Sequence, residues 1–143
     1  GQRATPEQVT VEPGRGVLGD HWGRYAYDEP GNEVSLVNVH VLSALAGGDE
    51  AAMALSGDNF HVDLDLSEEN LPVGTELALG TALLRVSPMP HRPCRKFVQR
   101  FGPMAAKRVA RGNHLGHRTR GVLCEVIAGG KIHAGDEVVV RQA

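Results

Sequence analysis

The stretch of residues 75–87 constrains the fold most, because apolar and polar side chains alternate along it with a period of two. Residues 75–79 form one run, Gly80 interrupts it, and residues 81–87 form the next. Such alternation is typical of strands that bury one face and turn the other toward solvent or a cavity. Two consecutive strands are therefore predicted at the centre of the chain, and the prolines that follow Ser87 are expected to end the second.

Shorter segments of the same kind lie on both sides of this centre. We expect further strands at residues 7–12, 33–37, 60–64, 119–127 and 137–141. Turns rich in Gly, Asp and Asn separate them, at residues 57–59, 128–131 and 134–136. About seven or eight short strands favour a mainly β fold, a closed or nearly closed antiparallel β-barrel with helical insertions.

The expected helices are few and short. Asn38 suits the cap of a helix that runs through Leu45, with a strand continued through Val41 as the competing interpretation. Further helices are expected over residues 49–55, from Pro93 to Phe101, and from Pro103 to Ala110, the last ended by Gly112.

Bulk properties are those of a single globular domain. With 143 residues and 41% hydrophobic content, the chain can bury a core without disulfides, so we expect one domain over residues 1–143. No apolar run is long enough to span a bilayer, and the first residues lack the apolar part of a secretory signal. A cytoplasmic location is the prediction that follows.

Cys94 is the most reactive group that the sequence offers. Pro93 suits the first position of a helix, so the Cys94 thiol is expected in a first turn, where free backbone N–H groups favour a thiolate. Neighbouring cations favour it further, and the predicted effect is a low thiol pKa. A buried, inert cysteine on the apolar face of the same helix is the alternative.

The second cysteine has a different setting. Cys124 lies between Leu123 and Val126 in a predicted strand, which indicates a core residue. The two cysteines lack the spacing of a zinc finger, so neither a disulfide framework nor a structural zinc site is expected.

Basic residues are concentrated in one part of the chain. Nine Lys or Arg residues and no acidic residue lie between Arg92 and Arg120, and 14 of the 17 acidic residues precede that block. The block suits an anion site or the solvated faces of two helices. A nucleic-acid partner is not expected, because the block contains few aromatic residues. The oligomeric state, including a homodimer, is left open.

Several polar residues are candidates for contact with a small anionic ligand. Cys94 is the candidate catalytic residue and metal ligand. The candidate cofactor-binding residues are Asp20, His21, Asn59, His61, His91, Arg92, Arg95, Lys96 and Arg100.

Four segments in a fixed order resemble the MOSC domain family, named from the C-terminal part of molybdenum cofactor sulfurases. The four segments are residues 16–20, residues 57–60 with 71–80, residues 93–102, and residues 120–136 with Gly129-Gly130-Lys131-Ile132 and Gly135-Asp136. The resemblance implies a β-rich barrel and assigns Cys94 to the family's loop cysteine, which ligates molybdenum or carries sulfur. It implies the molybdenum cofactor as ligand, and sulfur transfer or the reduction of N-hydroxylated compounds as chemistry. The chain looks like a small stand-alone member.

Three functions remain open from the sequence. The first is an anion-binding domain in which Cys94 is a metal ligand or sulfur carrier. The second is a small-molecule enzyme with Cys94 as nucleophile and a histidine as base, chosen from His21, His61, His91 and His117. The third is a non-catalytic, ligand-sensing barrel.

Overall fold

The computed structural model describes residues 8–18, 33–49, 52–53, 58–91 and 95–141. For Arg95 and Lys96 it describes the backbone alone. Pro93 and Cys94 lie outside these ranges, and so does most of the glycine-rich segment that follows Val17.

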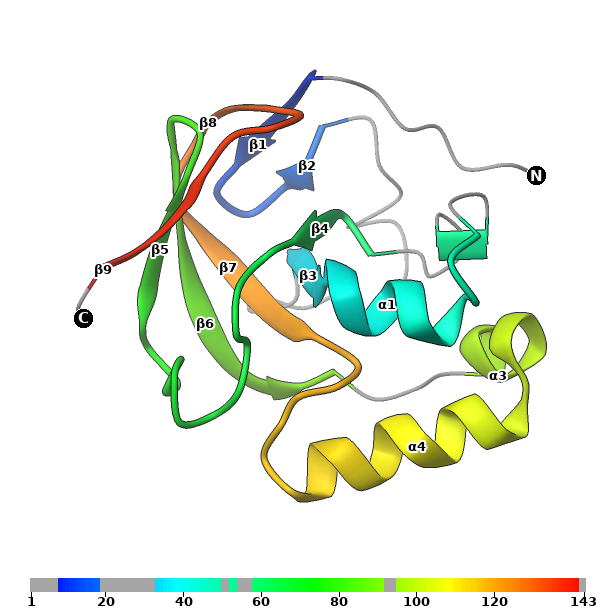
Figure 1. The fold of residues 1–143 in the computed structure, drawn as a ribbon. Coiled ribbons are helices and arrows are strands. Elements are labelled where there is room, and N and C mark those ends of the chain that lie inside the picture. Colours follow the sequence, from blue (N-terminus) through cyan, green and yellow to red (C-terminus); the bar gives the residue numbers. More distant parts are fainter. Residues whose placement is uncertain (1–7, 19–32, 50–51, 54–57, 92–94, 142–143) are drawn as a thin grey trace.

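The core of the molecule is a curled six-stranded sheet (Figure 1). Its strand order is β4 (Phe60–Val62), β3 (Val34–Asn38), β7 (Val122–Ala128), β6 (Ala82–Pro90), β5 (Glu76–Leu79) and β9 (Val138–Arg141). A second sheet contains β2 (Gly16–Val17), β1 (Gln8–Glu12) and β8 (Gly130–His133), in that order. The sheets curl into a nearly closed barrel around one buried apolar cluster, which includes Leu36, Leu77, Leu84 and Val122. The mainly β, nearly closed barrel expected from the sequence is confirmed.

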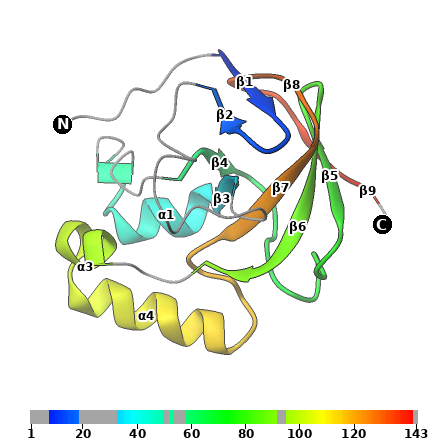
Figure 2. The ribbon, with the colours of Figure 1, turned by 180° about the vertical axis from the view of Figure 1, so that it is seen from behind.

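Three helices lie together at one side of the barrel, as Figure 2 also shows. They are α1 (Val39–Leu45), α3 (Arg95–Phe101) and α4 (Pro103–His114). The chain leaves the end of β6, passes through α3 and α4, and returns as β7 beside β6. This excursion brings the ends of two central strands close to the C-terminal end of α4. No helix in the described ranges is long and apolar enough to cross a membrane.

Asn38 caps α1 as predicted, so the alternative strand through Val41 is wrong. The Asn38 side-chain oxygen accepts hydrogen bonds from the backbone N–H groups of His40 and Val41, at 2.9 and 3.0 Å. Helix α1 lies in the crossover connection between β3 and β4. The two strands therefore run in the same direction and pair in parallel, so the expected antiparallel pairing is wrong at this pair.

The central hairpin forms as expected, but its second strand is longer than predicted. Strand β6 continues through Pro88 and ends at Pro90. Its pairing with β7 is irregular between Val86 and Pro90. Proline lacks an N–H group to donate, and at an irregular stretch of ladder this loss is tolerated.

Two elements near the chain's end differ from the prediction. Helix α4 does not end at Gly112 but continues to His114. The absence of a side chain at Gly112 makes room for Thr119, which packs directly against the helix there. Gly130 and Lys131, predicted as part of a turn over residues 128–131, belong to strand β8, which pairs with β1.

Candidate functional site

A buried ion pair lies between the barrel and the helices. The Asp58 carboxylate, whose side chain is fully buried, is 2.6 Å from Nη1 of Arg120, whose side chain is 5% exposed. Asp58 stands just before β4 and Arg120 just before β7, and these two strands flank β3, so the pair links the segments on either side of β3. Charges are rarely placed in such an environment unless each is paired, and removing either partner leaves a buried charge uncompensated.

His91 is the third member of this cluster. Its Nε2 atom lies 2.8 Å from Oδ1 of Asp58, and its side chain is 17% exposed. Burial alone would raise the pKa of Asp58, but the hydrogen bond from His91 and the charge of Arg120 outweigh it and hold the pKa below its ordinary value. Asp58 is therefore ionised and can only accept hydrogen bonds. It follows that Nε2 of His91 carries a proton, and that Nδ1 is the basic nitrogen of the neutral ring.

Arg120 also contacts the first residues of α3. Its guanidinium carbon lies 4.9 Å from the centre of the Phe97 ring, which is 3% exposed. A cation over a buried aromatic face contributes about 1–2 kcal/mol. The ring of Phe97 in turn lies against that of Phe101, with 4.8 Å between their centres. These contacts fix the buried face of α3 on the barrel.

Asn113, near the end of α4, closes the cluster with both ends of its amide. Its Nδ2 donates to the backbone oxygen of His91 at 3.1 Å, and its Oδ1 accepts from the backbone N–H of Arg120 at 3.2 Å. The end of α4, the segment after β6 and the start of β7 are thus held together. His91 and Phe97, three residues before and three after Cys94, are both attached to Arg120 or to its partner Asp58.

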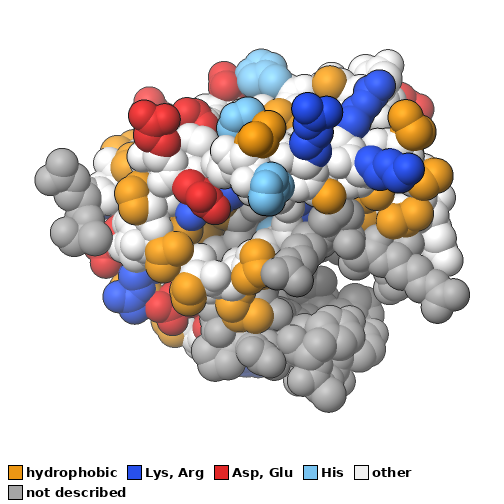
Figure 3. Space-filling view, turned by 90° about the horizontal axis from the view of Figure 1, so that it is seen from below, with side chains coloured by type: hydrophobic (Ala, Val, Ile, Leu, Met, Phe, Trp, Pro, Cys, Tyr) orange, Lys and Arg blue, Asp and Glu red, His pale blue; other side chains and the backbone are white. Residues whose placement is uncertain are grey.

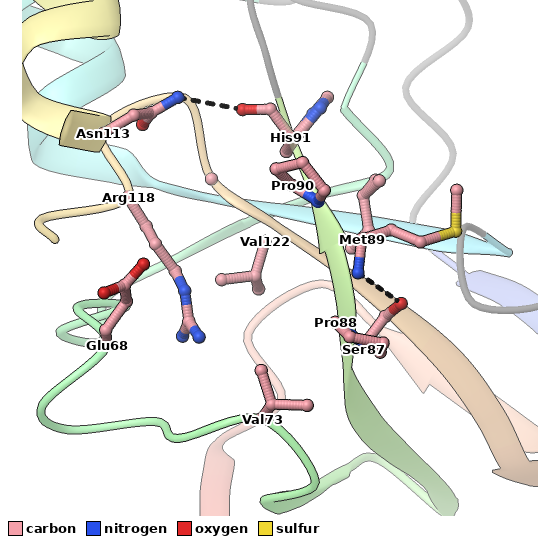
Figure 4. Close-up of a pocket in the computed structure, with 12 residues that line it drawn as sticks. Glu68, Val73, Ser87, Pro88, Met89, Pro90, His91, Asn113, Arg118 and Val122 are labelled. Atoms are coloured by element: carbon pink, nitrogen blue, oxygen red, sulfur yellow. Dashed lines mark hydrogen bonds between the residues drawn. The ribbon is translucent and has the colours of Figure 1, made fainter.

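A cavity of about 130 Å³ lies beside this cluster. One wall is the end of β6, where Ser87 to His91 follow each other, and Val122 of β7 lies behind them (Figure 4). Arg118 and Glu68 face that wall, and Val73 lies at the lower side in this view. The cavity therefore combines apolar walls with a few polar groups, as small-molecule sites do.

The predicted site residues whose side chains the structure describes fall into three sets. His91 belongs to the buried cluster. Asn59 is structural, because its Oδ1 accepts from the backbone N–H of Ser35 at 2.8 Å and so ties β3 to the start of β4. His61 and Arg100 are exposed on β4 and α3. The remaining predictions lie outside the described residues or have undescribed side chains: Asp20, His21, Arg92, Cys94, Arg95 and Lys96.

The described residues of the basic block also differ in their surroundings. On α4, Lys107, Arg108 and Arg111 are exposed, and Figure 3 shows Lys and Arg side chains gathered on that side of the molecule. This part of the block is a solvated helix face. Arg118 and Arg120, in contrast, turn toward the cavity and the cluster. For Cys124 the core assignment is confirmed: the side chain is fully buried, and burial raises the thiol pKa to about 12.

Asp58, Asn113, Arg118 and Arg120 were not singled out from the sequence. Asp58 follows Gly57 and looks like a turn residue, and the two arginines are part of a block whose members on α4 are solvated. The one local signal is Gly121, which has a φ of 113° and whose Cβ would overlap the backbone oxygen of Leu36. Only glycine allows this approach, which fixes the backbone beside Arg120.

The sequence matches the MOSC domain family over residues 23–139, which is most of the chain. The chain belongs to the MOSC domain family. The match includes Asp58, His91, Cys94 and Arg120, so the buried cluster and the segment that carries the thiol are both part of the MOSC domain. A search of curated proteins found no match.

Solved structures share the MOSC domain's fold. The YuaD protein of Bacillus subtilis superimposes with a TM-score of 0.67 at 20% identity, over 96% of this chain and 86% of that one. The YiiM proteins of Escherichia coli and Geobacillus stearothermophilus give TM-scores of 0.65 and 0.63 at 22% and 17% identity. They cover 95% and 94% of this chain, which spans only 63% and 60% of theirs. At these identities the likeness concerns the fold.

Proposed function

We propose that this MOSC domain binds an anionic ligand and uses the Cys94 thiolate as a metal ligand or a sulfur carrier. One observation carries the proposal. Cys94 lies in the sequence midway between His91 and Phe97, and both of these residues are attached to the buried Asp58–Arg120 pair. Anchors on both sides of a short segment reduce the conformational entropy that its central residue loses when a ligand binds.

The chemistry of the segment supports the same role. Arg92, Arg95 and Lys96 surround Cys94 in the sequence, and nearby cations lower a thiol pKa. A thiolate is a soft ligand suited to molybdenum and to sulfur transfer. Among the described residues no group of three His, Cys, Asp or Glu side chains is placed to hold a metal. The metal ligand in this proposal is Cys94.

The size of the described cavity limits where a molybdenum-pterin ligand would bind. The cavity has about 130 Å³, whereas sites for ligands of cofactor size have about 300–1,000 Å³. The cavity is therefore too small for a pterin. If the cofactor is the ligand, it binds outside the cavity and supplies the metal that the Cys94 thiolate ligates.

Metal analysis and thiol titration test the proposal together. Protein purified from its native host should contain molybdenum that is lost in Cys94→Ser and kept in the matched variant Cys124→Ala. For sulfur carriage, the expected result is a cyanide-labile sulfur on Cys94. The rate of alkylation by iodoacetamide should reach half its maximum well below the pH of about 8.5 expected for a free thiol. A half-maximum near that of free cysteine, with neither molybdenum nor labile sulfur, would reject this function.

The cluster also favours a second candidate, an enzyme with Cys94 as nucleophile and His91 as base. Of the described histidines proposed for this role, His61 and His117 are exposed, whereas His91 is oriented by a buried carboxylate. A base held by an acidic partner is the usual arrangement beside an activated nucleophile. If this candidate is correct, His91→Gln should raise the alkylation pKa of Cys94, and His61→Gln should leave it unchanged. Equal profiles for the two variants would exclude His91 as the base.

A further inference from the structure

We propose that the cavity between β6, β7 and the segment 66–73 binds a small carboxylate, with Arg118 as its anion-binding group. The inference concerns described residues only and does not depend on the reactivity of Cys94. It goes beyond the proposed function because it assigns a second site, its chemistry and the size of its ligand.

The orientation of Arg118 is fixed by the protein. Its Nη1 donates to the backbone oxygens of Leu66 and Leu71, at 3.2 and 2.6 Å. The residue itself has a φ of 49°, the one positive value among the described residues other than glycine. Its backbone oxygen accepts a hydrogen bond from Gly121 at 2.8 Å. Such a conformation is uncommon for a residue with a side chain, and here it directs the guanidinium to the cavity.

The charge of Arg118 is not neutralised by an ion pair within the described part of the chain. Burial lowers the pKa of its guanidinium, and the nearby carboxylate of Glu68 partly offsets this effect. An arginine stays protonated under such conditions. A half-buried cation with N–H groups beyond those bound to Leu66 and Leu71 favours an anion, and a carboxylate matches its forked geometry.

The other polar groups inside the cavity are compatible with a ligand that carries hydrogen-bond acceptors. The Ser87 hydroxyl oxygen accepts from the backbone N–H of Met89 at 3.1 Å, so its hydrogen is directed elsewhere. Both ends of the Asn113 amide are engaged with the backbone. Glu68, the one acidic residue of the lining, is exposed to solvent. Arg118 is therefore the group that supplies donors to the cavity, which suits a ligand that carries acceptors.

The size and the walls of the cavity define the rest of the ligand. About 130 Å³ equals the volume of roughly four water molecules in the liquid, enough for a ligand of about four to six non-hydrogen atoms. Val73, Pro88 and Val122 supply apolar surface to the lining (Figure 4). A carboxylate with a short hydrocarbon chain, of the size of propionate or butyrate, meets both requirements.

Titration followed by backbone amide NMR tests this site, with propionate as probe and propionamide as its uncharged control. Ionic strength is kept constant with chloride. Propionate should cause saturable shifts at Ser87, Arg118 and Val122, in about the millimolar range. Propionamide should bind at least about tenfold more weakly, since it lacks the charge that Arg118 recognises.

Three variants complete the test. Arg118→Gln should weaken propionate binding by about tenfold or more. Val73→Trp should block the cavity; because Val73 is 56% exposed, this change does not disturb the core. Arg111→Gln, on the solvated face of α4, should bind as the wild type does.

Equal binding of propionate and propionamide would overturn the inference, and so would unchanged binding by Val73→Trp. If Arg118→Gln does not fold, these two results decide. Cys94→Ser separates this proposal from the previous one: it should keep propionate binding whatever its effect on metal or sulfur. If Arg111→Gln abolishes the propionate shifts, the anion binds on α4 and the proposed cavity site is wrong.

Discussion

At the scale of single residues, Asp58 contributes most to the site, because its buried carboxylate pairs with the Arg120 guanidinium and is hydrogen-bonded to His91. Asp58→Asn removes the charge and leaves the Arg120 guanidinium buried without its counter-ion. The expected loss is about 3–5 kcal/mol in the free energy of unfolding, measured with urea at pH 7. Asp63→Asn, at an exposed carboxylate paired with His40, is the matched control and should change little. Equal losses in the two variants would show that the cluster does not stabilise the fold.

The same carboxylate predicts a pH dependence. The pKa of Asp58 is lower in the folded chain than its ordinary value of 3.8, so the folded state binds this proton less readily than the unfolded state does. The stabilisation is therefore complete above about pH 4 and is lost as the pH falls through the folded pKa. Unfolding experiments between pH 6 and 3 should show the difference between the wild type and Asp58→Asn shrinking only below about pH 4. A constant difference down to pH 3 would place the effect of Asp58 in its hydrogen bonds and not in its charge.

Cys124 shows how burial decides the role of a thiol. Its pKa of about 12 keeps it protonated at neutral pH, and its full burial keeps reagents away. We expect Cys124→Ala to leave ligand binding intact and to cost about 1–2 kcal/mol of stability. In a thiol titration without urea, Cys124→Ala should react as fast as the wild type. In urea, the wild type should show one reactive thiol more than the variant. Lost ligand binding at retained stability would contradict the core assignment.

At the scale of secondary structure, Gly112 is a helix residue kept small by a neighbour. In an exposed helix Gly→Ala stabilises by about 1 kcal/mol. Here the new methyl group would overlap Oγ1 of Thr119 and lie 2.8 Å from its Cβ. We expect Gly112→Ala to lower stability by about 1–3 kcal/mol, as overpacking does. Thr119→Ala removes the closest atom, so the double variant should recover part of the loss in a double-mutant cycle; strict additivity would contradict the proposed contact.

Elements that depend on local chemistry were predictable from the sequence. The Asn38 cap satisfies N–H groups two and three residues ahead, and the alternation over residues 75–87 reports which face of a strand is buried. Elements that depend on partners distant in the chain were not. Strand β8 exists because it pairs with β1, more than one hundred residues earlier.

The same distinction applies to the candidate site. His91 was found because it stands beside Cys94 in the sequence. Asp58 and Arg120 were missed because they are 62 residues apart and neither has a local pattern that sets it apart from the other charged residues of the chain. Composition and periodicity carry no information about which of nine clustered cations is buried. Only the folded sheet, which places β4 and β7 on either side of β3, brings the pair together.

At the scale of the whole molecule, Glu33 joins the two sheets of the barrel. Its side chain, 5% exposed, accepts from the backbone N–H of Gly14 in the β1–β2 turn at 3.1 Å and from that of Val126 in β7 at 2.5 Å. Glu33→Gln keeps one acceptor and presents an NH₂ group to an N–H donor. One of the two backbone donors then loses its partner, and the expected cost is about 1–3 kcal/mol.

Hydrogen exchange locates this effect. In Glu33→Gln the amides of Gly14 and Val126 and those of β1 should exchange faster, because the smaller sheet separates more often from the larger one. The amides of β5, on the far side of the large sheet, should change only with the global stability. Glu12→Gln, which removes an exposed carboxylate paired with Arg15 in the same turn, is the control and should leave the exchange pattern unchanged. Uniform acceleration in Glu33→Gln would mean that the barrel opens as one unit, and that Glu33 stabilises the whole fold without selectively joining its two sheets.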